Sequence, residues 1–321
     1  MTTEERHIRS ISELNAIVKG GGFAALAAEC EKLHTERISR IAELVASRVP
    51  AARLVLEAGP SAAGKTTAAI RLCNALAANG LAALRISTDD YFVGDARNPR
   101  DAEGNLDYEH INAVDRRRLA KDLLKIFAGE PLHRRRFDFV KHEGFDDPEL
   151  FTPPQNVVVV LEGIHALNPV LTEGVGDELK YRVYVNTLTQ LEADLGGWLY
   201  FEDARLMRRI VRDKTYRDMS PEKTILMWEK VSAGEMRWIN PYRGFADSVF
   251  NTALDYEIAV MKPLLEPVLK AVPYLGGRES AEIRRLLAVL EAVEPAVDCR
   301  DVPGDSILRE SIGGSVFDYV V

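Results

Sequence analysis

The residues of this chain best suited to chemistry begin with a glycine-rich stretch at Gly59. It reads Gly-Pro-Ser-Ala-Ala-Gly-Lys-Thr, follows the apolar run 54–58, and precedes a predicted helix over 67–78. This pattern in this context is typical of a P-loop, whose backbone N–H groups and following helix N-terminus hold phosphate oxygens. Glycine suits such a loop because no Cβ keeps the backbone away from the phosphates. The stretch therefore predicts binding of a nucleoside triphosphate, without saying what is done with it.

Two side chains of the loop have separate tasks in this interpretation. Lys65 can reach the β- and γ-phosphates, and the Thr66 hydroxyl can ligate Mg²⁺. ATP and Mg²⁺ are accordingly the expected cofactors. The remaining predicted nucleotide-binding residues of the loop are Gly59, Ser61, Ala62, Ala63, Gly64 and Thr67.

Two carboxylates follow predicted strands and could act on the bound nucleotide. Asp89 comes just after 83–87, where it could orient an acceptor hydroxyl and take its proton. Aspartate is a weak base, with a pKa of about 3.9, so we expect positioning to carry most of its effect. Glu162 ends the apolar run 157–161 and could hold Mg²⁺ beside Thr66. The alternatives are that Asp89 or its neighbour Asp90 only caps a turn, and that Glu162 is a solvent-exposed acid.

Four arginines recur three or four residues apart and share one helical face: Arg205, Arg208, Arg209 and Arg212. A guanidinium suits a phosphoryl-transfer site because its fork meets phosphate oxygens with two hydrogen bonds. We expect a lid over 203–220 that closes over ATP and carries these arginines, together with Arg217, over the transferring group. The alternative is a solvated basic face.

Candidates for the acceptor site are weaker. Phe137 and His142 lie on a stretch that looks irregular, where they could stack on and hydrogen-bond a flat molecule. Asp107 could accept hydrogen bonds from substrate hydroxyls, or cap a helix that is predicted to start near Tyr108. Alternatively, His142 is an ordinary surface residue.

The elements that must position these residues alternate between strands and helices. Strands are predicted at 54–58, 83–87, 157–161 and 181–185, with helical patterns between them. This alternation favours an α/β fold with a P-loop NTPase-type parallel sheet, which binds ligands beyond the carboxyl ends of its strands. We expect a kinase-sized domain over 51–275. A helical extension over 1–50, with helices at 11–18, 23–33 and 36–48, precedes it, and a helix at 280–292 plus a tail follow within 276–321.

Composition excludes several classes of protein. The 321 residues carry 41 Lys and Arg against 49 Asp and Glu, a net charge of −8, so electrostatic binding of nucleic acid is not expected. The three cysteines are widely spaced, which fits a reducing compartment. Without an apolar run of 18 residues, no membrane span is expected, and the cytoplasm is the default location.

Taken in order, these motifs resemble the uridine kinase and phosphoribulokinase family of P-loop kinases. The resemblance rests on the P-loop, the segments at 87–92 and 138–142, Glu162-Gly163, and the arginine run 208–217. A closer resemblance is to bacterial uridine kinase-like nucleoside kinases that are often fused behind a threonyl-tRNA-synthetase-like region, here represented by the kinase part. Residues 161–169, 188–190 and the tail 306–315 carry this second resemblance.

The resemblance implies roles for individual residues. Asp89 falls where the family has its catalytic base, Asp107 where it holds ribose hydroxyls, and Phe137 and His142 where it holds the base. Tyr91 and Trp228 complete the implied acceptor set. By the same resemblance, Arg209, Arg212 and Arg217 fall in the lid that closes on the phosphates, with Arg209 and Arg212 as catalytic residues and Arg217 as a nucleotide-binding residue. Departures are found at Phe137, where the family typically has tyrosine, at Trp228, where it has glutamine, and at 195–201, where the close relatives are polar. Each departure makes the acceptor pocket more apolar, which puts uridine as acceptor in doubt more than phosphoryl transfer itself.

The implied activity is transfer of the ATP γ-phosphate to a hydroxyl of a nucleoside such as uridine or cytidine. Two alternatives stay open. One is the same transfer to another alcohol, such as a sugar, sugar phosphate, polyol or vitamin precursor. The other is a nucleotide-dependent regulatory module. The expected partner is a small-molecule acceptor, and a homo-oligomer formed through the terminal helices is a further option.

Overall fold

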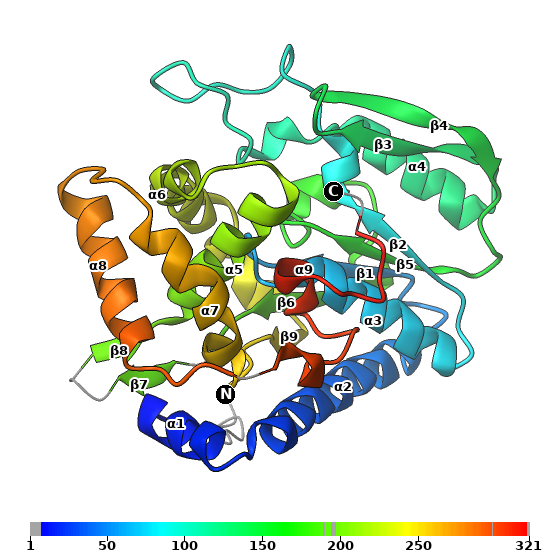
Figure 1. The fold of residues 1–321 in the computed structure, drawn as a ribbon. Coiled ribbons are helices and arrows are strands. Elements are labelled where there is room, and N and C mark those ends of the chain that lie inside the picture. Colours follow the sequence, from blue (N-terminus) through cyan, green and yellow to red (C-terminus); the bar gives the residue numbers. More distant parts are fainter. Residues whose placement is uncertain (1–7, 189, 194–196, 297, 320–321) are drawn as a thin grey trace.

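The computed structural model describes residues 8–188, 190–193, 197–296 and 298–319. Its centre is a five-stranded sheet in the order β2-β5-β1-β6-β9, in which every neighbouring pair is parallel (Figure 1). The strands are β1 (Leu54–Ala58), β2 (Ala83–Ser87), β5 (Val158–Glu162), β6 (Lys180–Asn186) and β9 (Ser248–Asn251). The predicted α/β parallel sheet is confirmed. The edge strand β9 was not predicted.

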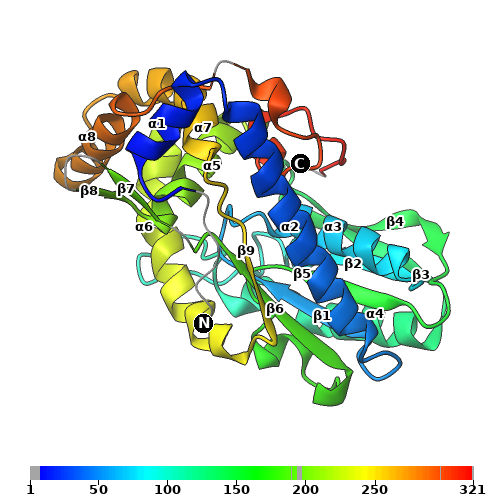
Figure 2. The same ribbon diagram turned by 90° about the horizontal axis from the view of Figure 1, so that it is seen from below.

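Helices cover both faces of this sheet and extend to one side of it (Figures 1 and 2). The described α-helices are α1 (Ile11–Lys19), α2 (Phe23–Ala46), α3 (Lys65–Ala78), α4 (Arg116–Ala128), α5 (Phe201–Tyr216), α6 (Pro221–Trp238), α7 (Glu257–Lys270), α8 (Gly277–Glu291) and α9 (Arg309–Ile312). Two antiparallel pairs complete the fold: β3 (Leu132–Asp138) with β4 (Glu143–Phe151), and β7 (Leu191–Ala193) with β8 (Gly197–Leu199). None of the described helices has the length and apolarity needed to cross a membrane.

The sheet is buried on both faces because its central strands are apolar along their whole length. In β5, Val158 and Val160 pack toward α2 and α3, whereas Val159 and Leu161 pack toward α4. This double burial explains why the run at 157–161 shows no alternation of polar and apolar residues. It also leaves the carboxyl ends of the strands as the natural place for polar side chains.

Three predicted elements differ from the structure. The helices predicted at 23–33 and 36–48 are one continuous helix, α2, because His34 at the expected break is buried against the ring of Phe250. The stretch around Phe137 is a β-hairpin and not irregular. The helix expected near Tyr108 begins at Arg116, where the Asp115 side chain accepts a hydrogen bond from the Arg118 N–H.

The N-terminal extension is packed directly on the P-loop helix. Figure 2 shows α2 running alongside α3. Between them, the Arg71 guanidinium lies 3.4 Å from the Glu31 carboxylate, which also accepts a hydrogen bond of 2.7 Å from the Tyr256 hydroxyl. A buried ion pair of this kind is costly to break, so α2 holds α3 in place. The domain limits at 50 and 275 stay a prediction.

Candidate active site

The P-loop connects β1 to α3 and presents backbone groups to an anion. Ala62 and Gly64 have φ values of 59° and 85°, which turn the chain sharply before the helix begins at Lys65. No side chain caps the N-terminus of α3. The first N–H groups of a helix have no partner within it, so in this uncapped turn they are available to phosphate oxygens. The loop therefore fits a triphosphate.

Not every loop glycine serves the phosphates. A Cβ on Gly59 would lie 1.9 Å from the Val185 carbonyl oxygen, so glycine is needed there for close contact with β6. Gly163 is needed for a similar reason. A Cβ on Gly163 would lie 1.8 Å from the Thr88 Oγ1, so this glycine allows close packing against the turn that follows β2.

A cavity of about 320 Å³ opens beside the start of α3, at the carboxyl ends of β2 and β5. Its lining brings together five of the predicted site residues: Thr66, Asp89, Glu162, Arg212 and Arg217. These residues come from four separate segments of the chain, since Arg212 and Arg217 both belong to the end of α5, so the fold brings them together. Lys65 precedes Thr66 and does not itself line the cavity; its ammonium donates a hydrogen bond of 3.0 Å to the Pro60 carbonyl.

The two neighbouring aspartates after β2 have different surroundings. The short 3₁₀ turn Thr88–Tyr91 follows the strand, and the Asp89 N–H donates to the Ser87 hydroxyl at 3.3 Å. Asp90 lies 3.4 Å from the Arg136 guanidinium on β3. Both carboxylates line the cavity, but Asp90 is engaged in an ion pair with the hairpin. Asp89 is therefore better placed to receive an acceptor hydroxyl.

Glu162 has a second buried carboxylate beside it. Glu57 on β1 is in register with Glu162 on β5, and Arg85 on β2 donates to Glu162 at 3.1 Å. Burial, and then the charge of Glu162, raise the pKa of Glu57 well above its usual range. Burial and the negative charge of Asp89 raise the pKa of Glu162, whereas Lys65 and Arg85 oppose this. Glu57 was missed, although a lone charged residue inside an apolar strand was the signal available.

The residues present fit a magnesium ion that is held largely by the nucleotide. Thr66 and Glu162 both line the cavity and offer the oxygen donors that Mg²⁺ prefers. Within the described residues, no group of three or more histidine, cysteine, aspartate or glutamate side chains is arranged to hold a metal. An ion here would complete its shell with phosphate oxygens and water, as magnesium commonly does.

Two of the four helical arginines do not face the phosphates. Arg205 pairs with Glu235 of α6 at 2.7 Å, and Arg208 pairs with Glu257 of α7 at 2.5 Å. Both guanidiniums are buried, so the solvated-face alternative is wrong for them. Their ion pairs hold α5 against its neighbours, and Arg205 also lies 3.5 Å from the Ser61 carbonyl of the loop.

The other arginines gather around one buried carboxylate, Asp213. Arg209, Arg212 and Arg217 approach it at 3.2, 2.8 and 3.7 Å. Arg209 also donates to the Ser61 hydroxyl at 2.8 Å, which places its guanidinium at the P-loop. Asp213 was missed by sequence reasoning. Asp213 neutralises and orients three cations. Its position in the middle of the arginine run is the sequence signal that could have identified it.

The proposed lid is restricted by the packing of α5. Leu206, Met207, Ile210 and Val211 of this helix belong to the buried apolar core that includes α7 and α8. Moving the whole helix would expose this surface, at a cost of roughly 25 cal/mol per Å². The lid over 203–220 therefore stays a prediction, confined to the residues from Tyr216 onward.

On the acceptor side, the predicted pair Phe137 and His142 belongs to a cluster of rings. Phe137 meets Phe92 edge to face at 5.6 Å and Phe139 at 5.1 Å between ring centroids. Phe137 is only 5% exposed, so its ring is committed to this cluster. His142 lies in the hairpin turn with a φ of 56°, and its Nδ1 is 3.1 Å from the Tyr108 hydroxyl. Asp95 completes the group, 3.2 Å from the His142 Nδ1.

Asp107 lies in the long loop before α4, together with a glutamate that was not predicted. The Asp107 carboxylate accepts a hydrogen bond of 3.1 Å from the Glu109 N–H. Burial raises the pKa of Glu109 to about 7, against the opposing charges of Arg209 and Lys65. Glu109 packs closely against Gly234 of α6, because a Cβ on Gly234 would lie 2.6 Å from the Cβ of Glu109. The long loop thus brings a titratable carboxylate near the phosphate site.

The structure does not place Tyr91 and Trp228 at the site. Tyr91 is 4% exposed, belongs to the core between the sheet and α4, and donates to Asp122 at 3.2 Å. Trp228 packs against the core that includes α5, with the Arg205 guanidinium 5.5 Å from its ring centroid. Neither ring lines the cavity, because Tyr91 is buried and Trp228 is partly buried in packing within the fold. The apolar departure at 195–201 lies partly outside the described residues.

Comparison with known proteins agrees with this site. Residues 55–259 match the model of the phosphoribulokinase / uridine kinase family, which is more than half of the chain. The chain belongs to this family. It is therefore a P-loop kinase, an enzyme that transfers phosphate to an alcohol group.

Individual relatives support the assignment at moderate similarity. A uridine kinase of Deinococcus deserti is 28% identical over 193 residues, which cover 60% of this chain and 84% of the relative. A uridine kinase of Pasteurella multocida is 26% identical over 219 residues, which cover 67% and 92%. A crystal structure from Silicibacter sp., provisionally described as a fructose transport system kinase, has a TM-score of 0.50 at 17% identity. It covers 66% of this chain and 98% of its own, and shows the shared fold alone.

Proposed function

We propose that this kinase transfers the γ-phosphate of ATP to a primary hydroxyl of a nucleoside of the uridine or cytidine type. The observation that carries the proposal is the meeting of Asp89 with Thr66, Glu162, Arg212 and Arg217 around one cavity beside the start of α3. The names of the relatives support a nucleoside as acceptor. A cytoplasmic location belongs to the proposal because ATP is the donor.

Each residue has a role in the proposed reaction. The loop N–H groups and Lys65 bind the phosphates, which requires Lys65 to leave the Pro60 carbonyl. Thr66 and Glu162 would hold Mg²⁺, which neutralises charge on the β- and γ-phosphates when bound. Asp89 accepts a hydrogen bond from the acceptor hydroxyl and aims its oxygen at the γ-phosphorus. The proton of the acceptor hydroxyl passes to Asp89 late in the formation of the new P–O bond, because aspartate is a weak base.

The arginines act on the charge of the transferring group. Arg209 already reaches the loop at Ser61, and Arg212 and Arg217 line the cavity beside it. Guanidiniums held in place before the reaction stabilise developing charge without reorganising, which is the main electrostatic contribution to such a transfer. Asp213 positions all three from behind.

The acceptor is the finer part of the proposal. Asp107 is proposed to bind sugar hydroxyls, and the ring cluster with His142 to contact the base. Phe137 lacks the hydroxyl of a tyrosine and is committed to its neighbouring rings, which favours a second candidate acceptor: a non-nucleoside alcohol such as a sugar or polyol.

A coupled assay of ADP release separates these candidates. Uridine, cytidine and purine nucleosides are compared with sugars, sugar phosphates and polyols, and phosphorylated product is identified by mass. Turnover of a pyrimidine nucleoside well above the other acceptors supports the leading proposal. Turnover only of a non-nucleoside alcohol favours the second candidate. Slow ATP hydrolysis without phosphorylated product would favour a regulatory module.

A further inference from the structure

The C-terminal tail lies against the P-loop, although no step of the proposed reaction uses it. In Figure 1 the tail continues from α9 across the start of α3. The Tyr319 hydroxyl is 2.8 Å from the Thr67 Oγ1, and the Ile307 side chain covers Gly64 so closely that a Cβ there would lie 2.4 Å from the Ile307 Cγ2. Two residues of the tail thus touch two residues of the phosphate loop.

The tail is a fixed part of the fold. Ile307 and Leu308 are buried in the two cores on either side of it. The Arg309 guanidinium donates to the carbonyls of Cys299, Val302 and Gly313, and these hydrogen bonds hold residues 299–313 in one conformation. A segment held in this way can present its remaining residues in a defined position.

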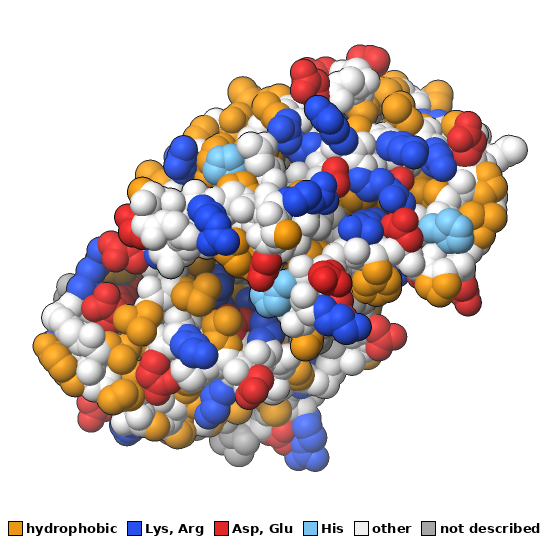
Figure 3. All heavy atoms as spheres, turned by 90° about the horizontal axis from the view of Figure 1, so that it is seen from above, with side chains coloured by type: hydrophobic (Ala, Val, Ile, Leu, Met, Phe, Trp, Pro, Cys, Tyr) orange, Lys and Arg blue, Asp and Glu red, His pale blue; other side chains and the backbone are white. Residues whose placement is uncertain are grey.

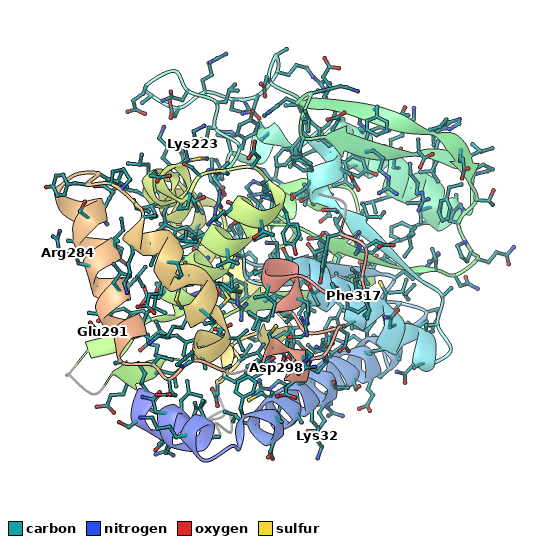
Figure 4. The ribbon with its side chains drawn as sticks, viewed as in Figure 1. Lys32, Lys223, Arg284, Glu291, Asp298 and Phe317 are labelled. Atoms are coloured by element: carbon teal, nitrogen blue, oxygen red, sulfur yellow. The ribbon has the colours of Figure 1, made fainter. Side chains whose placement is uncertain are left out.

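Those remaining residues form one wall of the cavity beside the start of α3. Gly313, Gly314, Ser315, Phe317 and Tyr319 line the same space as Thr66 and Asp89. Figure 4 labels Phe317 on this part of the tail, close to α3. Tyr319 is held from two sides, because its hydroxyl also receives a hydrogen bond of 3.2 Å from Ser315. The wall therefore offers two aromatic rings, one of them fixed to the loop.

The place of contact indicates which part of a nucleotide this wall would meet. In a P-loop, the lysine reaches the β- and γ-phosphates and the next hydroxyl holds the metal, so the residue after it lies toward the α-phosphate. In this chain that residue is Thr67, the partner of Tyr319. The group beyond the α-phosphate is the nucleoside. A flat base binds well on an aromatic ring, because every base has a face that can stack.

We propose that Ser315, Phe317 and Tyr319 of the C-terminal tail form the wall against which the nucleoside portion of ATP binds, with Phe317 as the stacking ring and Tyr319 as its support. The inference rests on the proposed function in taking ATP as the phosphate donor. It does not depend on which acceptor is used. The tail would thereby determine affinity for the nucleotide, whereas the arginines and Asp89 act on the transferring phosphate.

Calorimetric titration of the full chain tests this with two ligands, ATP and inorganic tripolyphosphate, each with Mg²⁺. The variants are Phe317→Ala and Tyr319→Phe. The matched control is Val316→Ala, a residue of the same segment that is 70% exposed. We expect Phe317→Ala to weaken ATP binding about tenfold and tripolyphosphate binding less than about twofold. Tyr319→Phe is expected to weaken ATP binding a few-fold, and the control neither ligand.

Three results would overturn the proposal. An equal loss of affinity for both ligands would mean that the tail serves the phosphates or the stability of the loop. Tighter binding of ATP in the variants would mean that the tail blocks the site. Unchanged affinity for ATP would mean that the tail does not contact it. Thermal unfolding checks that each variant folds, and Tyr319→Phe, which removes one oxygen, supplies the test if Phe317→Ala does not. Because binding is measured without acceptor, failure of the nucleoside-kinase proposal would leave this result intact.

Discussion

The phosphate side of the cavity and its acceptor side are built in different ways. On the phosphate side, charged groups sit on buried strands and helices and are paired, as Arg85 is with Glu162 and Arg212 with Asp213. On the acceptor side, the β3–β4 hairpin and the loop before α4 carry rings that are partly open to solvent, such as Phe139. The first side is fixed by the core, and the second rests on the outside of it.

This difference separates the reaction from the choice of acceptor. Removing one partner of a buried ion pair typically costs about 3–5 kcal/mol, whereas an exposed pair contributes about 0–1 kcal/mol. Changes on the phosphate side should therefore reduce both turnover and stability. Changes on the hairpin should alter acceptor binding and leave the rest of the molecule intact.

Figure 3 shows that Lys and Arg side chains gather across the middle of the face that carries the hairpin, with Asp and Glu among them.

The largest effect is expected for Asp89→Asn. The amide has nearly the same shape but cannot accept the proton, so kcat should fall about 10²–10⁴-fold while the KM for ATP changes little. Steady-state kinetics with ADP detection measures this. Asp90→Asn is the matched control, because its carboxylate pairs with Arg136. If Asp90→Asn loses more activity than Asp89→Asn, the assignment of the two carboxylates is reversed.

The next effect is expected for Asp213→Asn, which removes the charge that orients three guanidiniums. We expect kcat/KM for ATP to fall about 10–100-fold and the variant to lose about 3–5 kcal/mol of stability. Kinetics and chemical denaturation test the two effects together. Asp218→Asn serves as control, since it lies in the same segment, is exposed and has a φ of 48° that asparagine tolerates. Full activity of Asp213→Asn would show that the arginines need no common anchor.

Glu109 lies between the two sides and provides a pH test. Its pKa is raised from 4.5 to about 7, so the folded state favours the protonated form, and this stabilisation is lost as pH rises from about 4.5 to 7. Above pH 7 the carboxylate adds negative charge near Lys65 and Arg209, and Asp89 and Asp107 already contribute such charge. We expect the KM for ATP to rise as pH passes 7.

Glu109→Gln is the comparison that isolates this titration. The variant should keep a flat KM for ATP between pH 6 and pH 8, apart from the ionisation of ATP itself, which affects both proteins equally. Between pH 4.5 and pH 7, the free energy of unfolding of Glu109→Gln should fall less than that of the wild-type protein. Identical pH profiles for both proteins would contradict a role for Glu109 in this change.

Sequence patterns predicted the phosphate side well, because local rules govern it. The P-loop needs a strand, a turn and a helix in succession, and four of the five sheet strands were found from their apolar runs. The edge strand β9 was missed because Ser248–Asn251 is short and half polar. Glu57 was missed because its importance comes from register with Glu162, which local patterns do not reveal.

The acceptor side was predicted less well, because distant contacts decide it. Tyr91 and Trp228 are aromatic residues near motifs, and only the packing shows that one faces α4 and the other the core around α5. On the phosphate side, Asp213 was missed for the same reason, because only its burial shows that it is an anchor. Residue types and spacing can be taken from a sequence, but the burial of a ring or a carboxylate by distant segments cannot.

The smallest effect is expected in the hairpin turn, where His142→Asn removes a ring and keeps a residue that tolerates a φ of 56°. The ring contacts Tyr108 and Asp95 near the surface, so stability should change by less than about 1 kcal/mol. The KM for the acceptor should rise a few-fold, while kcat and the KM for ATP stay within about twofold. Lys141→Ala, in the same turn and 75% exposed, is the control and should behave like wild type. A comparable rise in the KM for ATP would break the separation of the two sides, because it would show that the hairpin also positions the phosphates.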